Sequence, residues 1–186
     1  MTVVFVGGSR GITRLNGAVC ARLDTIVAKG LNVIVGDANG ADQAVQKYLS
    51  EKAYGNVAIF CSGDTPRNNV GRWATRKIRT NAPPGTAAFY TAKDEAMTEE
   101  ATIGFMLWDG KSIGTLLNVQ RLIEHGKKVV IFVNETKNFS ELKTKQDWNK
   151  FYSYCTSEIR TKLVGRAELR KSKAISLSPR IPSLAV

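Results

Sequence analysis

The stretch IGFMLWDGKSIGTLLNVQRLIEHGKKVVIFV, residues 103–133, decides the fold. Apolar residues fill both of its ends, and the apolar residues between them recur at helical spacing. This order predicts a strand over 103–108, a helix over 113–125 and a strand over 128–133. Strands that are apolar on both faces and are joined through a helix indicate a parallel sheet covered by helices on both sides.

The same alternation precedes this stretch. Short apolar runs at Thr2–Val6, Leu31–Val35 and Val57–Phe60 predict three strands. Helical periodicity over 15–27 and 41–52 separates them. The sequence therefore predicts an α/β fold, a Rossmann-like open parallel sheet of about five strands flanked by helices.

The remaining segments follow other patterns. Residues 62–87 are rich in Gly, Pro, Asn and Arg, so we expect a functional or mobile loop there. Apolar residues over 148–163 predict one amphipathic helix that packs on the body or on a second subunit, and we expect a homo-oligomer. We divide the chain into a nucleotide-binding domain (1–135), a helical extension (136–165) and a basic, flexible tail (166–186).

Composition narrows the class of protein. The 186 residues, 43% of them hydrophobic, suit one domain with a substantial core. The chain has neither an apolar run long enough to cross a membrane nor a basic region ahead of its first apolar residues, so no signal peptide is predicted. Its three cysteines lie far apart, which fits the cytoplasm. We predict no metal site and no cofactor.

Charge is concentrated toward the C-terminus. The net charge is +11, and residues from Lys137 onward supply eleven Lys and Arg against four Asp and Glu. Residues 137–186 therefore carry +7, and the residues before them only about +4. Basic tails bind polyanions, yet they also keep proteins in solution.

Three glycine-marked corners follow predicted strands, where an open parallel sheet binds its ligands. The first, GGSRG at 7–11, lacks the G-x-G-x-x-G spacing of a dinucleotide-binding turn but offers amides, a hydroxyl and a guanidinium. The second is GDANGAD at 36–42, where Asp42 either caps a helix or contacts a ribose. The third is DGKSIGT at 109–115, with two hydroxyls near a helix N-terminus.

The Gly-Lys-Ser of the third corner is not a P-loop. That motif needs a glycine five residues before Gly110, and Phe105 stands there within a buried strand. Two small-residue loops facing one crevice predict a phosphorylated or nucleotide-like ligand. The candidate ligand-binding residues are Gly8, Ser9, Arg10, Gly36, Asp37, Gly40, Asp42, Asp109, Gly110, Lys111, Ser112, Gly114 and Thr115.

Three blocks of sequence between residues 2 and 133 resemble the SLOG superfamily, in particular its YspA-like branch. They are VVFVGGSRG, VIVGDANGADQAVQKYL and AMTEEATIGFMLWDGKSIGTLLNVQRLIEHGKKVVIFV. The resemblance implies a Rossmann-like domain that binds nucleotide-derived ligands. Members of the superfamily include phosphoribohydrolases, a DNA-processing protein that binds single strands, and sensor domains of bacterial defence systems.

The chain departs from that family at two places. Phosphoribohydrolases place a catalytic glutamate where this chain has Asn118, and the YspA-like branch usually has Arg-Asn where this chain has Lys93-Asp94. Cleavage of an N-glycosidic bond would then need another carboxylate. The candidates are Asp109, Asp94 and Glu95.

Three functions follow as alternatives. The leading one is binding or sensing of a nucleotide or nucleotide-derived ligand. The second is N-glycosidic hydrolysis or transfer on such a ligand. The third is binding of single-stranded nucleic acid. The argument against it is that no aromatic residues alternate with the basic ones, whereas bases need aromatic rings on which to stack. Its contacts would come from the basic tail and from Arg67, Arg72, Arg76, Lys77 and Arg79.

Overall fold

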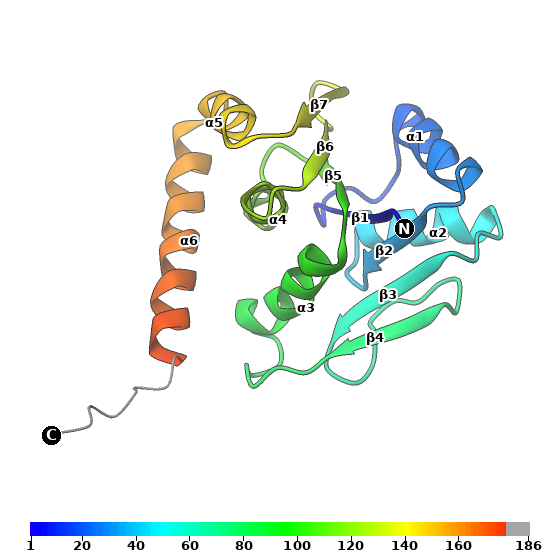
Figure 1. Cartoon of the computed structure of the whole chain (residues 1–186), viewed down its shortest axis with the longest axis horizontal. Helices are drawn as coiled ribbons and strands as arrows, with labels where there is room; N and C mark the ends of the chain where they lie inside the picture. Colours follow the sequence, from blue (N-terminus) through cyan, green and yellow to red (C-terminus); the bar gives the residue numbers. More distant parts are fainter. Residues whose placement is uncertain (178–186) are drawn as a thin grey trace, which may run out of the picture.

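The computed structural model describes the backbone of residues 1–177 and the side chains of residues 1–168 (Figure 1). One sheet of seven strands runs in the order β4-β3-β2-β1-β5-β6-β7. The strands are β1 (Val3–Gly8), β2 (Asn32–Gly36), β3 (Val57–Ser62), β4 (Ala74–Ile78), β5 (Ile103–Trp108), β6 (Lys128–Val133) and β7 (Asn138–Leu142). The helices are α1 (Gly17–Ala28), α2 (Ala41–Glu51), α3 (Ala87–Glu100), α4 (Ile113–Glu124), α5 (Lys145–Ser153) and α6 (Ser157–Leu177).

Alternation along the strands divides the core between the two faces of the sheet. On β1, Phe5 belongs to the apolar cluster beneath α3 and α4, while Val4 and Val6 belong to the cluster beneath α1 and α2. All three side chains are nearly fully buried. A strand buried on both faces must be apolar throughout, which explains the continuous apolar runs of the sequence.

The predicted fold class is confirmed, but the sheet has two strands more than the five or so that were expected. β4 lies in the segment predicted as a loop, pairs in parallel with β3 and exposes most of its side chains. β7 pairs antiparallel with β6 and is also partly exposed. Edge strands have one open side, so their sequences lack the continuous apolar run of a buried strand.

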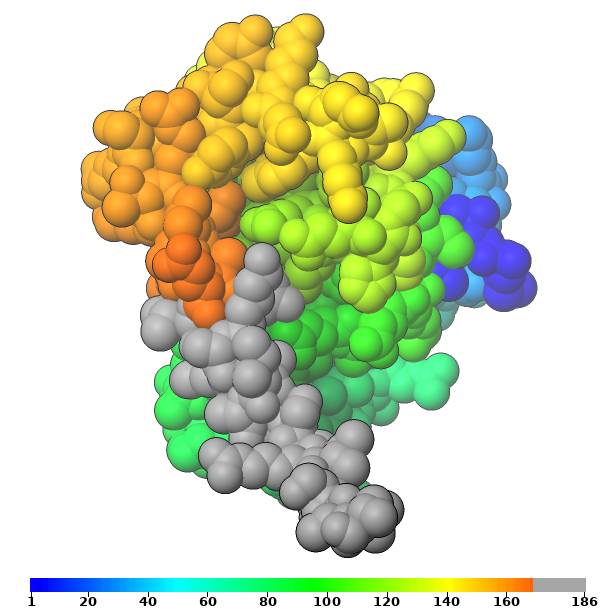
Figure 2. All heavy atoms as spheres, turned by 60° about the vertical axis from the view of Figure 1, so that its left-hand side comes forward, coloured from blue at the N-terminus to red at the C-terminus, as the bar shows by residue number. Residues whose placement is uncertain are grey.

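The C-terminal segment forms two helices, so the prediction of one helix over 148–163 is wrong. α5 ends at the C-cap Tyr154, and the hydroxyl of Thr156 accepts from the amide of Ile159 at the start of α6. Trp148 and Leu163 are buried in the cluster that contains α4. Figure 2 shows α6, in orange, lying on the outside of the molecule beside α5.

The segment therefore packs on the body, which was one of the two expected placements. Self-association stays a prediction, but the apolar face on which that prediction was based packs against the body. Residues 166–177 of the predicted flexible tail continue α6, and residues 178–186 lie outside the described part of the chain. The proposed boundary after residue 135 falls between β6 and β7. No helix among the described residues is long and apolar enough to span a bilayer.

Strand order also fixes where a ligand should bind. From β1 the sheet grows through β2 and β3 to β4, and the chain then returns to add β5 on the other side of β1. The connections after β1 and β5 diverge, and open parallel sheets bind ligands at such a switch point, in the space above the carboxyl ends of the strands that we call the crevice. The first and third corners both lie at this point.

Candidate functional site: the crevice at the carboxyl ends of β1 and β5

A hydroxyl network joins the first and third corners. The hydroxyls of Ser9 and Thr115 lie 3.1 Å apart, and Thr115 donates to the hydroxyl of Ser112 at 3.2 Å. Ser9 also accepts from the amide of Asp109 at 3.1 Å, and its side chain is fully buried. The structure thus brings these two predicted corners into direct contact.

The N-terminus of α4 opens beside this network. Ser112 is the N-cap but makes no side-chain capping bond, so the first amides of the helix have no partner from the cap. A Cβ atom added at Gly114 would meet no other atom within 4 Å. Unpartnered amides and the positive end of the helix dipole make such a terminus an anion-binding position.

Asp109 builds the loop that leads into α4. Its Oδ1 accepts from the amides of Lys111 at 3.0 Å and Ser112 at 2.8 Å. Gly110 has φ of +82°, and a Cβ there would collide with the carboxylate of Glu135. β5 continues through Trp108, so the loop is far too short to wrap a triphosphate. Lys111 is exposed at its tip.

The other predicted glycines allow the corners to pack closely. A Cβ at Gly8 would collide with the carbonyl oxygen of Leu107 across the sheet. Gly40 has φ of +83°, and a Cβ there would collide with the backbone of Arg10. At both positions the glycine is explained by contacts within the protein.

The second corner holds a charged pair instead of an open anion position. Both oxygens of Asp37 accept from Arg67, at 2.7 Å from Nη2 and 3.0 Å from Nε. Burial acts to raise the pKa of Asp37, but the hydrogen bonds from the Arg67 side chain and amide outweigh it and lower that pKa overall. The carboxylate is therefore charged and fully engaged.

A buried lysine lies beneath this pair. Lys93 of α3 is only 5% exposed, and its Nζ lies 2.9 Å from Asp94, 3.9 Å from Asp42 and 4.0 Å from Asp37. Burial acts to lower the pKa of Lys93, and the carboxylates of Asp94 and Asp42 more than offset this. A Cβ at Gly36 would collide with Asp42, so that glycine makes room for the cluster.

Asp42 lies in the first turn of α2, as predicted, but it bonds the preceding loop and α2 has no side-chain cap. Its Oδ2 accepts from the amide of Ala38 at 3.2 Å. Burial raises the pKa of Asp42 to about 6, although Lys93 opposes the shift. The side chain is buried between Gly36 and Gly7, so it has little contact with solvent.

The sequence analysis missed Tyr90, which lies in the first turn of α3. The Cζ atoms of Arg67 and Arg10 lie 4.4 Å and 5.6 Å from the centre of its ring. Such distances are typical of cation–π contacts. Because helix and loops meet here only in three dimensions, no short motif in the sequence could have revealed this group.

The carboxylates proposed for glycosidic cleavage have other partners. Asp94 is paired with Lys93, and Glu95 lies 3.7 Å from Arg121. Asn118, at the position of the family's glutamate, accepts from Arg121 at 2.6 Å within the buried side of α4. Asp109 binds its own loop. None of the three predicted carboxylates is therefore free, and the carboxylate that lies beside the loop into α4 is that of Glu135, next to Gly110.

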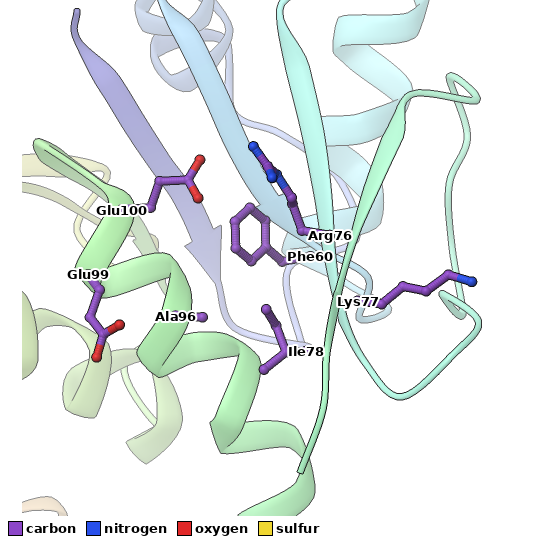
Figure 3. Close-up of a pocket in the computed structure, with 7 residues that line it drawn as sticks. All are labelled: Phe60, Arg76, Lys77, Ile78, Ala96, Glu99 and Glu100. Carbon is purple, nitrogen blue, oxygen red and sulfur yellow. The ribbon is translucent and has the colours of Figure 1, made fainter.

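The predicted basic cluster divides into two parts. Arg67 is held at the second corner, whereas Arg72, Arg76, Lys77 and Arg79 are exposed along or beside β4, at the edge of the sheet. A hollow of about 520 Å³ lies between β4 and the C-terminal half of α3 (Figure 3). Its rim mixes Arg76 and Lys77 with Glu99 and Glu100. We place the candidate site at the crevice, because mixed charges favour no anion.

Comparisons with known proteins support the fold alone. No protein-family model matches the chain, and no curated protein matches it. The structure of DNA processing protein A from Helicobacter pylori, described for its single-stranded DNA binding mode, is similar with a TM-score of 0.53 at 16% sequence identity. The similarity covers 70% of this chain and 64% of that protein. At this identity the similarity shows a shared fold, and the resemblance to the SLOG superfamily stays a prediction.

Proposed function

We propose that this protein binds a nucleotide-derived ligand through a phosphate group, in the crevice at the carboxyl ends of β1 and β5. The carrying observation is the open first turn of α4 beside the linked hydroxyls of Ser9, Ser112 and Thr115. The amides supply directed donors, and the partly exposed hydroxyl of Ser112, which accepts from Thr115, can donate to a phosphate oxygen. The open space over Gly114 lets the backbone approach the anion.

Single-stranded DNA is the second candidate ligand. The structural similarity to a single-strand-binding protein favours it, as do the exposed cations beside β4. A strand carries the same phosphate group as a free nucleotide, so both candidates use the N-terminus of α4.

Thermal shift and calorimetry with mono-, di- and cyclic nucleotides, ADP-ribose derivatives and oligothymidylate test the proposal. A ligand of the native state raises the apparent melting temperature in proportion to its occupancy. Gly114→Val should abolish this shift, because the side chain fills the space over the amides. Gly17→Val is the matched control, since Gly17 also begins a helix with no atom within 4 Å of an added Cβ.

Lys111→Ala should weaken binding by only about tenfold or less, because an exposed charge is screened by water. A P-loop lysine would behave differently, since its loss removes nucleotide binding almost entirely. Binding that depends on Lys111 and on magnesium, and survives in Gly114→Val, would contradict the proposed site. Oligothymidylate binding that is unaffected by Gly114→Val would place the DNA elsewhere.

A further inference from the structure

The hollow between β4 and the C-terminal half of α3 has an apolar floor (Figure 3). The ring of Phe60 is 2% exposed there, and the partly buried Ile78 and Ala96 pack against the same apolar cluster. The volume of about 520 Å³ lies within the range of sites that bind small molecules. The described part of the chain therefore leaves a recess of small-molecule size beside its edge strand.

Two opposite charges face this floor. Arg76 pairs in register with Phe60 on the neighbouring strand, so both side chains lie on the face of the sheet that α3 covers. Glu100 lies one helical turn after Ala96, on the same side of α3. In Figure 3 the side chains of Arg76 and Glu100 point into the hollow from its two walls, above the ring of Phe60. The hollow thus has a cation on one wall and an anion on the other.

Neither charge has a partner within the described part of the protein. Both side chains are exposed, and no salt bridge or side-chain hydrogen bond joins Arg76 or Glu100 to another described residue. They do not pair with each other either, so a gap separates the guanidinium from the carboxylate. Each group repels ions of its own sign, so neither an anion nor a cation alone suits the hollow, whereas a molecule with both charges can pair with both groups.

We propose that this hollow binds a free α-amino acid with an apolar side chain. The carboxylate of the amino acid accepts from the guanidinium of Arg76, whose fork of donors matches a carboxylate. The ammonium donates to the carboxylate of Glu100, and the apolar side chain covers the floor around Phe60. The hollow lies beside β4 and the crevice lies at β1 and β5, so this inference is independent of the proposed nucleotide binding.

NMR titration of the isotope-labelled full chain with matched probes tests the inference. The probes are L-leucine and L-phenylalanine, the amide of each, which lacks the carboxylate, and the N-acetyl derivative of each, which lacks the ammonium. At least one of the two amino acids should bind with a dissociation constant of about 1 mM or lower and shift the amide signals of β4 and of the C-terminal half of α3. Each derivative should bind about tenfold or more weakly, because it lacks one charge-assisted contact.

Two variants, each with a matched control, assign these contacts. Arg76→Gln should weaken binding of the amino acid by about tenfold or more and leave binding of its amide unchanged, because the amide has no carboxylate for the guanidinium. Glu100→Gln should weaken binding of the amino acid similarly and leave binding of the N-acetyl derivative unchanged. Lys77→Gln and Glu99→Gln make the same charge changes at neighbouring side chains that point away from Phe60 in Figure 3, and should leave every affinity unchanged.

Three outcomes would overturn the inference. They are the absence of binding by both amino acids up to about 10 mM, equal affinities for an amino acid and its two derivatives, and binding that Arg76→Gln and Glu100→Gln leave unchanged. Gly114→Val should not affect this binding, because Gly114 lies in the first turn of α4. If that variant abolished it, the amino acid would bind in the crevice and the inference would be wrong.

Discussion

At the scale of single residues, Asp42 makes the stability of the protein depend on pH. Its pKa is about 6 in the folded protein against 3.8 when unfolded, so the folded state retains the proton longer. The free energy of unfolding should therefore fall as pH rises from about 4 to about 7, by on the order of 3 kcal/mol for a shift of about two units. Asp42→Asn keeps an acceptor for the Ala38 amide and should remove this decline. Urea unfolding across that pH range measures it.

Asp24→Asn is the control for this experiment. The hydrogen bond from Tyr48 lowers the pKa of Asp24, so its contribution to stability is lost as pH falls and not as it rises. An identical decline in Asp42→Asn and in the unmodified protein would show that Asp42 is not the buried acid described above.

At the scale of elements, Leu163 is the buried residue among the described side chains of α6 (157–168), and the partly buried Ile159 packs against the same cluster. Leu163 is 3% exposed in the cluster with α4, whereas its neighbour Val164 is 47% exposed. Leu163→Ala should lower the free energy of unfolding by about 2–4 kcal/mol, because it leaves a cavity. Val164→Ala should change it by less than about 0.5 kcal/mol. Equal, small effects at both positions would mean that α6 does not pack as described.

The same scale shows how far the sequence predicts this molecule. Buried strands and the helices between them follow from apolar periodicity, and the contact of the first and third corners follows from strand order. β4 was missed because an exposed edge strand has no such pattern. The burial of Lys93 could have been predicted from the sequence, because Lys93 lies on the same helical face as Phe89 and the buried Met97. Its partners Asp37 and Asp42, like the Arg67 that Asp37 holds, are visible only in three dimensions.

At the scale of the whole molecule, the exposed cations beside β4 should increase the dependence of DNA binding on salt concentration. For a single strand, the slope of log K against log salt is about −0.7 for each phosphate neutralised. If a strand runs along β4, replacing Arg76 and Lys77 by alanine should reduce the magnitude of the slope by about 1.4. The same double replacement of Lys143 and Lys145, exposed at the opposite edge beyond β7, should leave it unchanged.

The central place of β1 also has a consequence for how the chain is made. Among the strands of this sheet β1 is synthesised first, yet one of its two neighbours is β5, and Val4 pairs with Ile103. One side of this central strand therefore stays without its partner until β5 has been synthesised. Throughout that interval the nascent polypeptide exposes an apolar strand edge, which is the kind of surface that chaperones protect from aggregation.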